Sequence, residues 1–281
     1  MAFPTIGRSH AIATVAALVG FGFACDAQLE EQPAEPIVES GIREPDWGRI
    51  ASTIEKIRED LGDVEGREGI LAEQRLYSNF DEELIIRDFF QDRRDGFFLD
   101  VGCSYPVRGS NTYYLEKHLG WTGIGVDALA DYESQWKKER PNSLFLAYLV
   151  TDRSGNRETF FKSPGLGLSS TNQELASGKL FGARLDTQEL QIDTITLNDL
   201  LDREAVTKIE LLSMDIEGHE PKALAGFDIE RFQPELVVIE RSVTPARNRL
   251  IRRYFERHGY QLIERYIPFD PVNSYFERKE H

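Results

Sequence analysis

Cysteine and basic residues are both scarce in this sequence. Its 281 residues include two cysteines, Cys25 and Cys103, too few for a disulfide scaffold or a four-thiolate zinc site. Lys and Arg number 33 against 48 Asp and Glu, which gives a net charge of −15. Because nucleic acids and anionic membrane surfaces attract proteins through a dense positive field, this balance argues against either as the main partner.

Long apolar runs are also missing. The N-terminal run at residues 11–24 (AIATVAALVGFGFA) has 14 residues, fewer than the ~20 that a spanning helix needs. The chain is 41% hydrophobic and 29% charged, as expected for a soluble globular protein. At roughly 150 residues per domain, the length predicts one large domain, alone or with extensions.

The N-terminal run has the length of the apolar part of a secretory signal, ~7–15 residues. Residues 22–25 (GFAC) resemble a bacterial lipobox, so we predict that residues 1–25 are a signal-like or lipoprotein-anchor segment with Cys25 lipidated. Ordinary signal cleavage, an uncleaved N-terminus and a misassigned start remain alternatives. The protein is then membrane-anchored or exported, contacting the membrane only through this segment, or else cytoplasmic.

The acidic excess is concentrated after this segment. Residues 26–69 hold 13 acidic and 5 basic residues, a net charge of −8, which equals the net charge of residues 70–281. Residues 26–46 are rich in Glu and Pro and cannot bury enough apolar surface to order themselves, so they are expected to be a solvated tether. In residues 47–79, helical spacing predicts an amphipathic helix over residues 47–61. The remaining domain would be residues 80–281.

From residue 80 onward, strand-like and helical patterns alternate. This alternation predicts a doubly wound, mostly parallel sheet in which ligands bind beyond the carboxyl ends of the strands. The last two strands would form an antiparallel edge. Strands are expected at residues 97–101, 123–126, 143–150, 208–214, 235–240, 260–267 and 274–278, and helices at residues 81–90, 112–119, 132–139, 221–225 and 247–258.

Candidate ligand-binding residues follow the first three strands. Asp100 and Gly102 lie at the first strand's end, where a glycine lets the backbone approach a nucleotide-like ligand. Ser104 stands where a second glycine would complete a dinucleotide fingerprint, which makes a nicotinamide enzyme unlikely. Asp127, after the second strand, can accept both hydroxyls of a ribose. Asp152, after the third, could meet an adenine amine.

The densest group of chemically active side chains is at residues 215–221 (DIEGHEP), between a strand and a helix. Asp215, Glu217, His219 and Glu220 gather there, and Glu240 at the end of the next strand could join them. Like charges held together cost free energy unless a cation or proton offsets them. The simpler alternative is that Glu217 and Glu220 only cap the helix.

Together these residues resemble the FkbM family of S-adenosylmethionine-dependent methyltransferases, over residues 80–278. The most specific element is residues 213–220 (SMDIEGHE). The resemblance also rests on residues 98–102 (FLDVG), 110–116 (SNTYYLE), 119–127 (LGWTGIGVD), 224–226 (LAG) and 238–240 (VIE).

The resemblance implies the class I methyltransferase fold, a Rossmann-like α/β fold with a seven-stranded, mostly parallel sheet and an antiparallel C-terminal edge. It also implies S-adenosylmethionine as cofactor. The residues it assigns to cofactor binding are Asp100, Gly102, Ser104, Asn111, Thr112, Asp127 and Asp152. Ser104 in place of a second small glycine, and Asp127 where many relatives have Glu-Pro, are departures from the family pattern.

The expected reaction is in-line methyl transfer to a hydroxyl oxygen of a small molecule, a sugar or a lipid-linked acceptor. His219 is one candidate general base, since its ordinary pKa of ~6.5 suits neutral pH. Alternatively, Asp215, Glu217 and Glu220 hold a divalent cation that lowers the pKa of the acceptor. The sequence does not choose between them. A non-catalytic scaffold with the same fold at a membrane is the competing function, and the sequence does not determine the oligomeric state.

Two further segments are interpreted more simply. Residues 165–171 (GLGLSST) are expected to form a flexible loop over the pocket, on the acceptor side. Cys103, beside the cofactor turn, is expected to be a small buried residue.

Overall fold

The computed structural model describes residues 77–164, 168–242, 244–270 and 272–279. The predicted signal segment, tether and amphipathic helix all lie outside these ranges, so they stay predictions, as does localisation. In the described part of the chain, no helix has both the length and the apolar character needed to cross a membrane.

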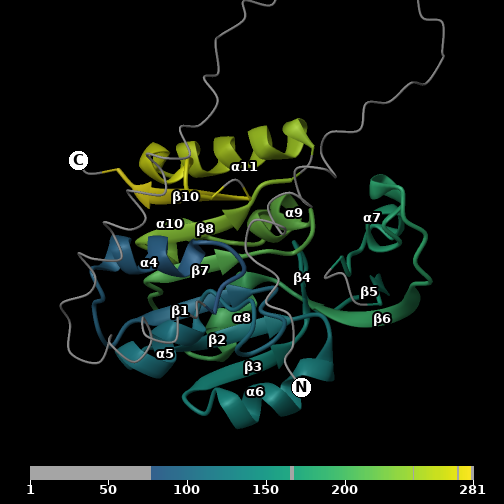
Figure 1. Cartoon of the computed structure of the whole chain (residues 1–281), viewed down its shortest axis with the longest axis horizontal. Helices are drawn as coiled ribbons and strands as arrows, with labels where there is room; N and C mark the ends of the chain where they lie inside the picture. Colours follow the sequence, from purple (N-terminus) through teal and green to yellow (C-terminus); the bar gives the residue numbers. More distant parts are fainter. Residues whose placement is uncertain (1–76, 165–167, 243, 271, 280–281) are drawn as a thin grey trace, which may run out of the picture. The chain divides into compact units, whose positions relative to one another are not determined.

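A seven-stranded sheet forms the centre of the domain, with strand order β3-β2-β1-β7-β8-β10-β9 (Figure 1). β3, β2, β1, β7 and β8 are parallel, while β10 runs antiparallel to both β8 and β9. The strands are β1 (Phe97–Val101), β2 (Thr122–Asp127), β3 (Ser143–Ala147), β7 (Leu211–Met214), β8 (Leu236–Glu240), β9 (Tyr260–Leu262) and β10 (Asn273–Arg278). The predicted fold, with its antiparallel C-terminal edge, is confirmed.

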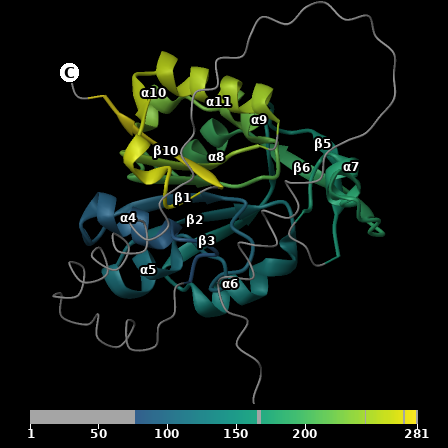
Figure 2. The ribbon, with the colours of Figure 1, turned by 45° about the horizontal axis from the view of Figure 1, so that its top comes forward.

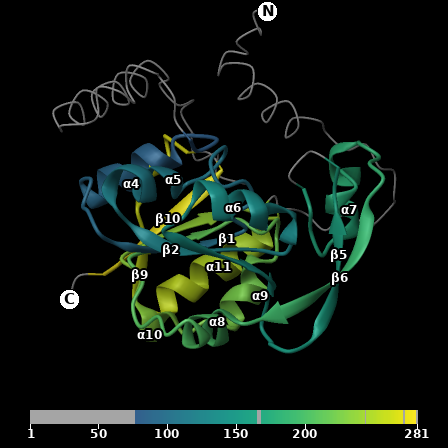
Figure 3. The same ribbon diagram turned by 90° about the horizontal axis from the view of Figure 1, so that it is seen from below.

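Helices cover both faces of this sheet (Figure 3). One face packs against α4 (Glu82–Phe90), α5 (Tyr113–Leu119) and α6 (Glu133–Glu139). The other packs against α8 (Leu197–Arg203), α9 (Glu220–Ala225), α10 (Ile229–Phe232) and α11 (Pro245–Arg257). Because β1, β7 and β8 at the centre of the sheet are buried on both faces, they are largely apolar runs rather than alternating ones.

The helices begin and end where local chemistry favours it. α4 ends before Gln91, whose left-handed backbone lets its N–H donate to the carbonyls of Arg87 and Asp88. Thr196 caps α8 by accepting the backbone N–H of Asp199. Pro221 lies in the first turn of α9, where its missing N–H costs no hydrogen bond. Short 3-10 helices occur at Ala130–Tyr132, Lys179–Phe181 and Glu264–Tyr266.

The third predicted strand, residues 143–150, is wrong as a single element. β3 ends at Ala147, and the chain then enters a second sheet as β4 (Leu149–Val150). At the crossing, the N–H of Tyr148 donates to the carbonyl of Asp127 over 2.9 Å. The apolar run continues through both pieces, although only Phe145, Leu149 and Val150 in them are buried, so hydrophobicity alone could not show that the strand changes sheets.

The second sheet forms a side arm, which we define as residues 157–195. It contains β5 (Arg157–Lys162), α7 (Gln173–Ala176) and β6 (Gln188–Ile195), with strand order β4-β6-β5. Figures 1 and 2 both show β5, β6 and α7 to one side of the main sheet. The sequence analysis predicted none of these elements, because much of β5 and β6 is exposed or only partly buried and so lacks a continuous apolar run.

One buried carboxyl should make the stability of this fold depend on pH. Glu82 is 4% exposed, accepts the backbone N–H of Phe80 over 2.7 Å and receives the Asn273 amide. Burial, and then the negative charge of Asp270, raises the pKa of Glu82 from 4.5 to about 8. Between pH 4.5 and about 8, Glu82 is protonated in the folded state and ionised in the unfolded state. The contribution of Glu82 to stability is therefore full below pH 4.5 and lost as the pH rises to about 8.

We expect Glu82→Gln to flatten this loss by roughly 1–3 kcal/mol, because glutamine stays neutral throughout. Urea unfolding at a series of pH values measures it. Glu189→Gln, which removes a charge at an exposed position, is the matched control. Equal pH slopes for the wild type and Glu82→Gln would contradict the assignment.

Candidate active site

A cavity of about 690 Å³ opens at the carboxyl ends of β1, β2 and β7. β1 lies where the strand order reverses, with β2 on one side and β7 on the other, which is where doubly wound sheets bind ligands. The cavity is lined by predicted site residues from all three strands and their loops. These are Asp100, Gly102, Ser104, Asn111, Asp127, Asp215, Glu217 and His219.

The turn after β1 forms the floor of this cavity. Gly102 has φ +83°, and a Cβ placed on it would lie 1.7 Å from the backbone oxygen of Asp215. Only glycine allows this approach. Ser104 has φ +48°, a conformation that glycine adopts more easily, and the Trp136 indole donates to its carbonyl over 2.8 Å. Although serine replaces the family's second glycine at position 104, the backbone there still has a conformation typical of glycine.

Asp100 lies beneath this turn and is 5% exposed. Thr112 Oγ1 donates to Asp100 Oδ2 over 2.7 Å. Burial raises the pKa of Asp100 to about 6, while the Thr112 hydrogen bond and the positive charge of Arg140 act in the opposite direction. The carboxyl is therefore mostly ionised at neutral pH and available to a cationic or hydrogen-bond-donating ligand group.

Asp127, at the end of β2, is held by two backbone groups. The N–H of Ser104 donates to Oδ2 over 3.0 Å, and the N–H of Leu129 donates to Oδ1 over 2.8 Å. Burial raises its pKa to about 6 against these two hydrogen bonds. Each oxygen keeps a second lone pair, so both can accept from a pair of ligand hydroxyls.

Three other predicted cofactor residues have different positions. Asn111 lines the cavity and donates to Ser213 Oγ over 3.2 Å. Thr112 is fully buried and contacts Asp100 rather than the cavity. Asp152 does not line the cavity; its Oδ1 accepts from Thr151, whereas Leu149 and Val150 of β4 are in the lining.

Asp215, Glu217 and Glu240 form the acidic group of the site. One carboxylate oxygen from each lies within 4.8 Å of the other two. Asp215 and Glu217 line the cavity and Glu240 does not. Glu217 has φ +56°, an unfavourable conformation for a non-glycine residue that often marks a functional site.

Burial and mutual repulsion change the protonation of this group. They raise the pKa of Glu217 to about 9. The Asp215 side chain is accessible to solvent through the cavity. Protein nevertheless surrounds it on the other sides, and this partial burial raises the pKa of Asp215 too. Its hydrogen bond with Glu240 lowers the pKa of Asp215 and raises that of Glu240, so the shared proton resides on Glu240.

Glu220 is outside this group of three. It is fully buried, and its Oε1 accepts the backbone N–H groups of Ile216 and Gly218, both over 3.1 Å. It therefore shapes the turn before α9, as the capping alternative supposed. Its place in the predicted metal-ligand set is taken by Glu240.

His219 lines the cavity but is engaged on both sides of its ring. Nδ1 lies 3.0 Å from Thr171 Oγ1 in the side arm, and Nε2 lies 3.4 Å from Thr151 Oγ1. Burial lowers the pKa of the imidazole from 6.5 to about 4, and the charge of Lys222 adds to this. A group so weakly basic, with both nitrogens occupied, is poorly suited to remove a proton at neutral pH.

The side arm contributes cavity residues that the sequence analysis did not single out as site residues. Phe160, Ser169 and Thr171 are in the lining. Ser170 Oγ donates to the carbonyl of Glu217 over 3.1 Å, which fixes the arm to the acidic turn. The loop expected over the pocket is thus partly in place, and its residues 165–167 lie outside the described ranges. Cys103 is buried, as expected, and burial raises the pKa of its thiol.

The strand order and this site define a class I S-adenosylmethionine-dependent methyltransferase. The residues suit that cofactor. A cavity of about 690 Å³ is within the ~300–1,000 Å³ usual for ligand sites. Gly102 gives close backbone access, and Asp100 and Asp127 offer carboxylates for an amine and a ribose.

The chain belongs to the family of the methyltransferase FkbM domain, whose sequence profile matches residues 100–262. This confirms the resemblance and the dependence on S-adenosylmethionine. No curated protein is matched by the sequence.

Solved methyltransferase structures are similar at low identity. A TehB-like enzyme from Corynebacterium glutamicum is 15% identical, with a TM-score of 0.40 over 83% of this chain and 100% of that one. The 1,6-didemethyltoxoflavin-N1-methyltransferase of Burkholderia thailandensis, with bound S-adenosylhomocysteine, is 11% identical, with a TM-score of 0.34 over 86% and 94%. Such distant similarity adds no weight, so the assignment rests on the family match and the strand order.

The glycine turn can be tested by adding a methyl group. Gly102→Ala should destabilise the fold by more than the roughly 1–2 kcal/mol of a positive φ alone, because the new Cβ also meets the Asp215 backbone. Gly155→Ala is the matched control, since Gly155 has φ +78° and open space around its Cβ position. Urea unfolding of both variants measures the difference. Equal losses would show that the close approach is unimportant.

Proposed function

We propose that this methyltransferase acts on a hydroxyl oxygen of a small molecule, a sugar or a lipid-linked acceptor. The observation that carries the proposal is the position of Asp215 and Glu217 on the wall of the same cavity that Asp100 and Asp127 line. Carboxylates at that place suit an acceptor that must lose a proton during the reaction.

The cofactor-binding part of the proposal uses the turns after β1 and β2. When bound, S-adenosylmethionine supplies an electrophilic methyl group on a positively charged sulfur. Asp127 would accept the ribose hydroxyls, and Asp100 and the backbone at Gly102 would hold the methionine portion. Asn111 and Ser104 also line the cavity. The protein would align the two reactants and exclude water from them.

Asp215 is the residue we assign to proton removal. Its hydrogen bond with Glu240 orients Asp215 and opposes the rise that burial causes in the pKa of Asp215, while Glu217 lies beside it in the acidic group. His219 instead connects Thr171 of the side arm to Thr151, so its role would be to hold the arm against the site.

A second candidate arrangement is a divalent cation held by the acidic group. Hard cations such as Mg²⁺ and Ca²⁺ prefer oxygen ligands, and three carboxylate oxygens within 4.8 Å of one another could reach one ion. Such an ion would lower the pKa of an acceptor hydroxyl.

The acceptor class is tested by incubating the protein with S-adenosylmethionine carrying an isotopically labelled methyl group and panels of sugars and hydroxylated lipids. Mass spectrometry should find the label on oxygen. Label on nitrogen or carbon would contradict the proposal. Calorimetry with S-adenosylmethionine comes first, because the absence of binding would support the scaffold function instead.

Replacing Asp215 should abolish most of the turnover. We expect Asp215→Asn, alone or with Glu217→Gln, to lower kcat by about 10²–10⁴-fold, because an amide cannot accept the proton. S-adenosylhomocysteine affinity, measured by calorimetry, should be unchanged. Asp186→Asn, at an exposed position in the side arm, is the control for charge. Turnover that survives the double substitution would overturn the assignment.

Removal of metal separates the two arrangements. If Asp215 acts without a cation, dialysis against EDTA should leave kcat unchanged. Loss of turnover that Mg²⁺ restores, and that Asp215→Asn makes insensitive to Mg²⁺, would instead assign a cation to the acidic group. The measurement is initial rate against added Mg²⁺ on the dialysed protein.

A further inference from the structure

Arg140 is an arginine with no solvent exposure, and the sequence analysis gave no reason to single it out. It directly follows α6, at the C-terminal end of that helix. Burying a guanidinium is costly unless its N–H groups are satisfied and its charge is balanced. Its partners therefore indicate what this position is for.

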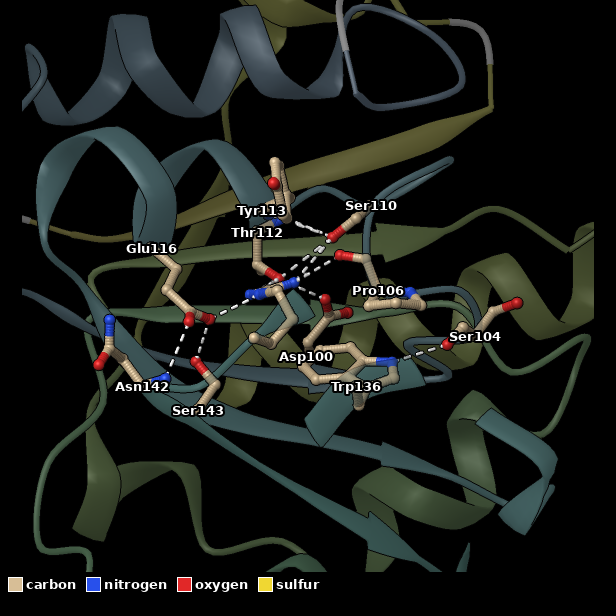
Figure 4. A network of polar contacts seen from close by, with 11 residues as sticks. Asp100, Ser104, Pro106, Ser110, Thr112, Tyr113, Glu116, Trp136, Asn142 and Ser143 are labelled. Atoms are coloured by element: carbon tan, nitrogen blue, oxygen red, sulfur yellow. Dashed lines mark hydrogen bonds and ion pairs between the residues drawn. The ribbon is translucent and has the colours of Figure 1, made fainter. Parts of the chain in front are cut away.

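Its guanidinium binds the loop between β1 and α5 at several points. Nη1 donates to the carbonyl of Pro106 over 3.0 Å and to Ser110 Oγ over 3.3 Å, and Nη2 donates to Thr112 Oγ1 over 3.1 Å. Figure 4 shows Pro106, Ser110 and Thr112 close together, beside Asp100. Ser104, Ser110 and Asn111 of the same loop line the cavity.

A carboxylate balances the charge of Arg140. Glu116 of α5, 4% exposed in its side chain, accepts from Arg140 Nε over 2.6 Å. The other bonds of Glu116, to Asn142 N and Ser143 Oγ, fix this carboxylate in turn. Because Glu116 balances the charge of Arg140, the main effect of the hydrogen bonds from Nη1 and Nη2 is to position the loop residues that accept them.

Thr112 connects Arg140 to Asp100, which lines the cavity. Its hydroxyl accepts from Arg140 Nη2 and donates to Asp100 Oδ2, so the chain of contacts runs from Arg140 through Thr112 to Asp100. One helical turn before Arg140, the Trp136 indole donates to the carbonyl of Ser104. The end of α6 thus holds both Asp100 and the turn that faces the ligand.

We propose that Arg140 is a positioning residue for cofactor binding: through Thr112 it orients the Asp100 carboxylate, and through Pro106 and Ser110 it sets the loop that lines the cavity. This inference rests on the proposed function, in which Asp100 holds part of S-adenosylmethionine. A purely structural role for Arg140 would affect stability and leave affinity for the cofactor unchanged.

A second buried arginine provides the matched control. Arg87 of α4 is 2% exposed, pairs with Glu83 and Asp92, and stacks on the Tyr114 ring. Glu83, Asp92 and Tyr114 do not line the cavity. Arg140→Lys and Arg87→Lys each keep the charge and lose the planar fork, so both should lower the thermal stability.

The test is calorimetric titration of the full chain with S-adenosylhomocysteine. We expect Arg140→Lys to weaken binding about tenfold or more, the effect of losing a charge-assisted hydrogen bond, and Arg87→Lys to bind as the wild type does. Equal affinities for Arg140→Lys, Arg87→Lys and wild type would overturn the inference. A wild type that binds no S-adenosylhomocysteine would overturn the proposed function instead.

Thr112 variants keep the test decisive if Arg140→Lys does not fold. Thr112→Val has nearly the same shape but removes the hydroxyl between Arg140 and Asp100, and Thr112→Ser retains it. We expect Thr112→Val to weaken binding of S-adenosylhomocysteine and raise the KM for S-adenosylmethionine. Thr112→Ser should keep both quantities near their wild-type values. If Thr112→Val and Thr112→Ser bind S-adenosylhomocysteine equally well, Arg140 does not act on Asp100 through Thr112.

Discussion

The close approach between the turn after β1 and the turn after β7 is the contact on which the site depends. Gly102 lies against the backbone oxygen of Asp215, and the N–H of Asp215 donates to the Val101 carbonyl over 2.9 Å. Parallel pairing of β1 with β7 brings together residues more than 100 positions apart. The same pairing brings Asp100 and Gly102 into one cavity with Asp215 and Glu217.

A second constraint is negative charge held in a small volume. The net charge of −15 argues against nucleic acid as the main partner, but the distribution of that charge is more informative. Half of it lies in residues 26–69, and several carboxylates of the domain converge on one cavity. Burial and repulsion raise the pKa of Glu217 and Glu240, which lowers the charge of the acidic group, and Arg140, paired with Glu116, opposes the rise in the pKa of Asp100.

Much of the fold could be predicted because the parallel strands are buried on both faces and so appear as apolar runs. The first strand was predicted at residues 97–101, and β1 has those bounds. The same rule failed at residues 143–150, where one apolar run crosses at Tyr148 from the main sheet to β4 of the second sheet. It was silent on β5 and β6, whose side chains are largely exposed or partly buried.

The sequence by itself determined the family, the carboxyl ends of β1, β7 and β8, and the types of side chain that follow them, because local patterns encode each of these. Only the tertiary structure decided which of those side chains meet. It grouped Glu240 rather than Glu220 with Asp215, left Asp152 out of the cavity, and enclosed Arg140 behind Asp100. Spacing along the chain does not record the direction in which a side chain points or how deeply its neighbours bury it, and those two quantities set the chemistry here.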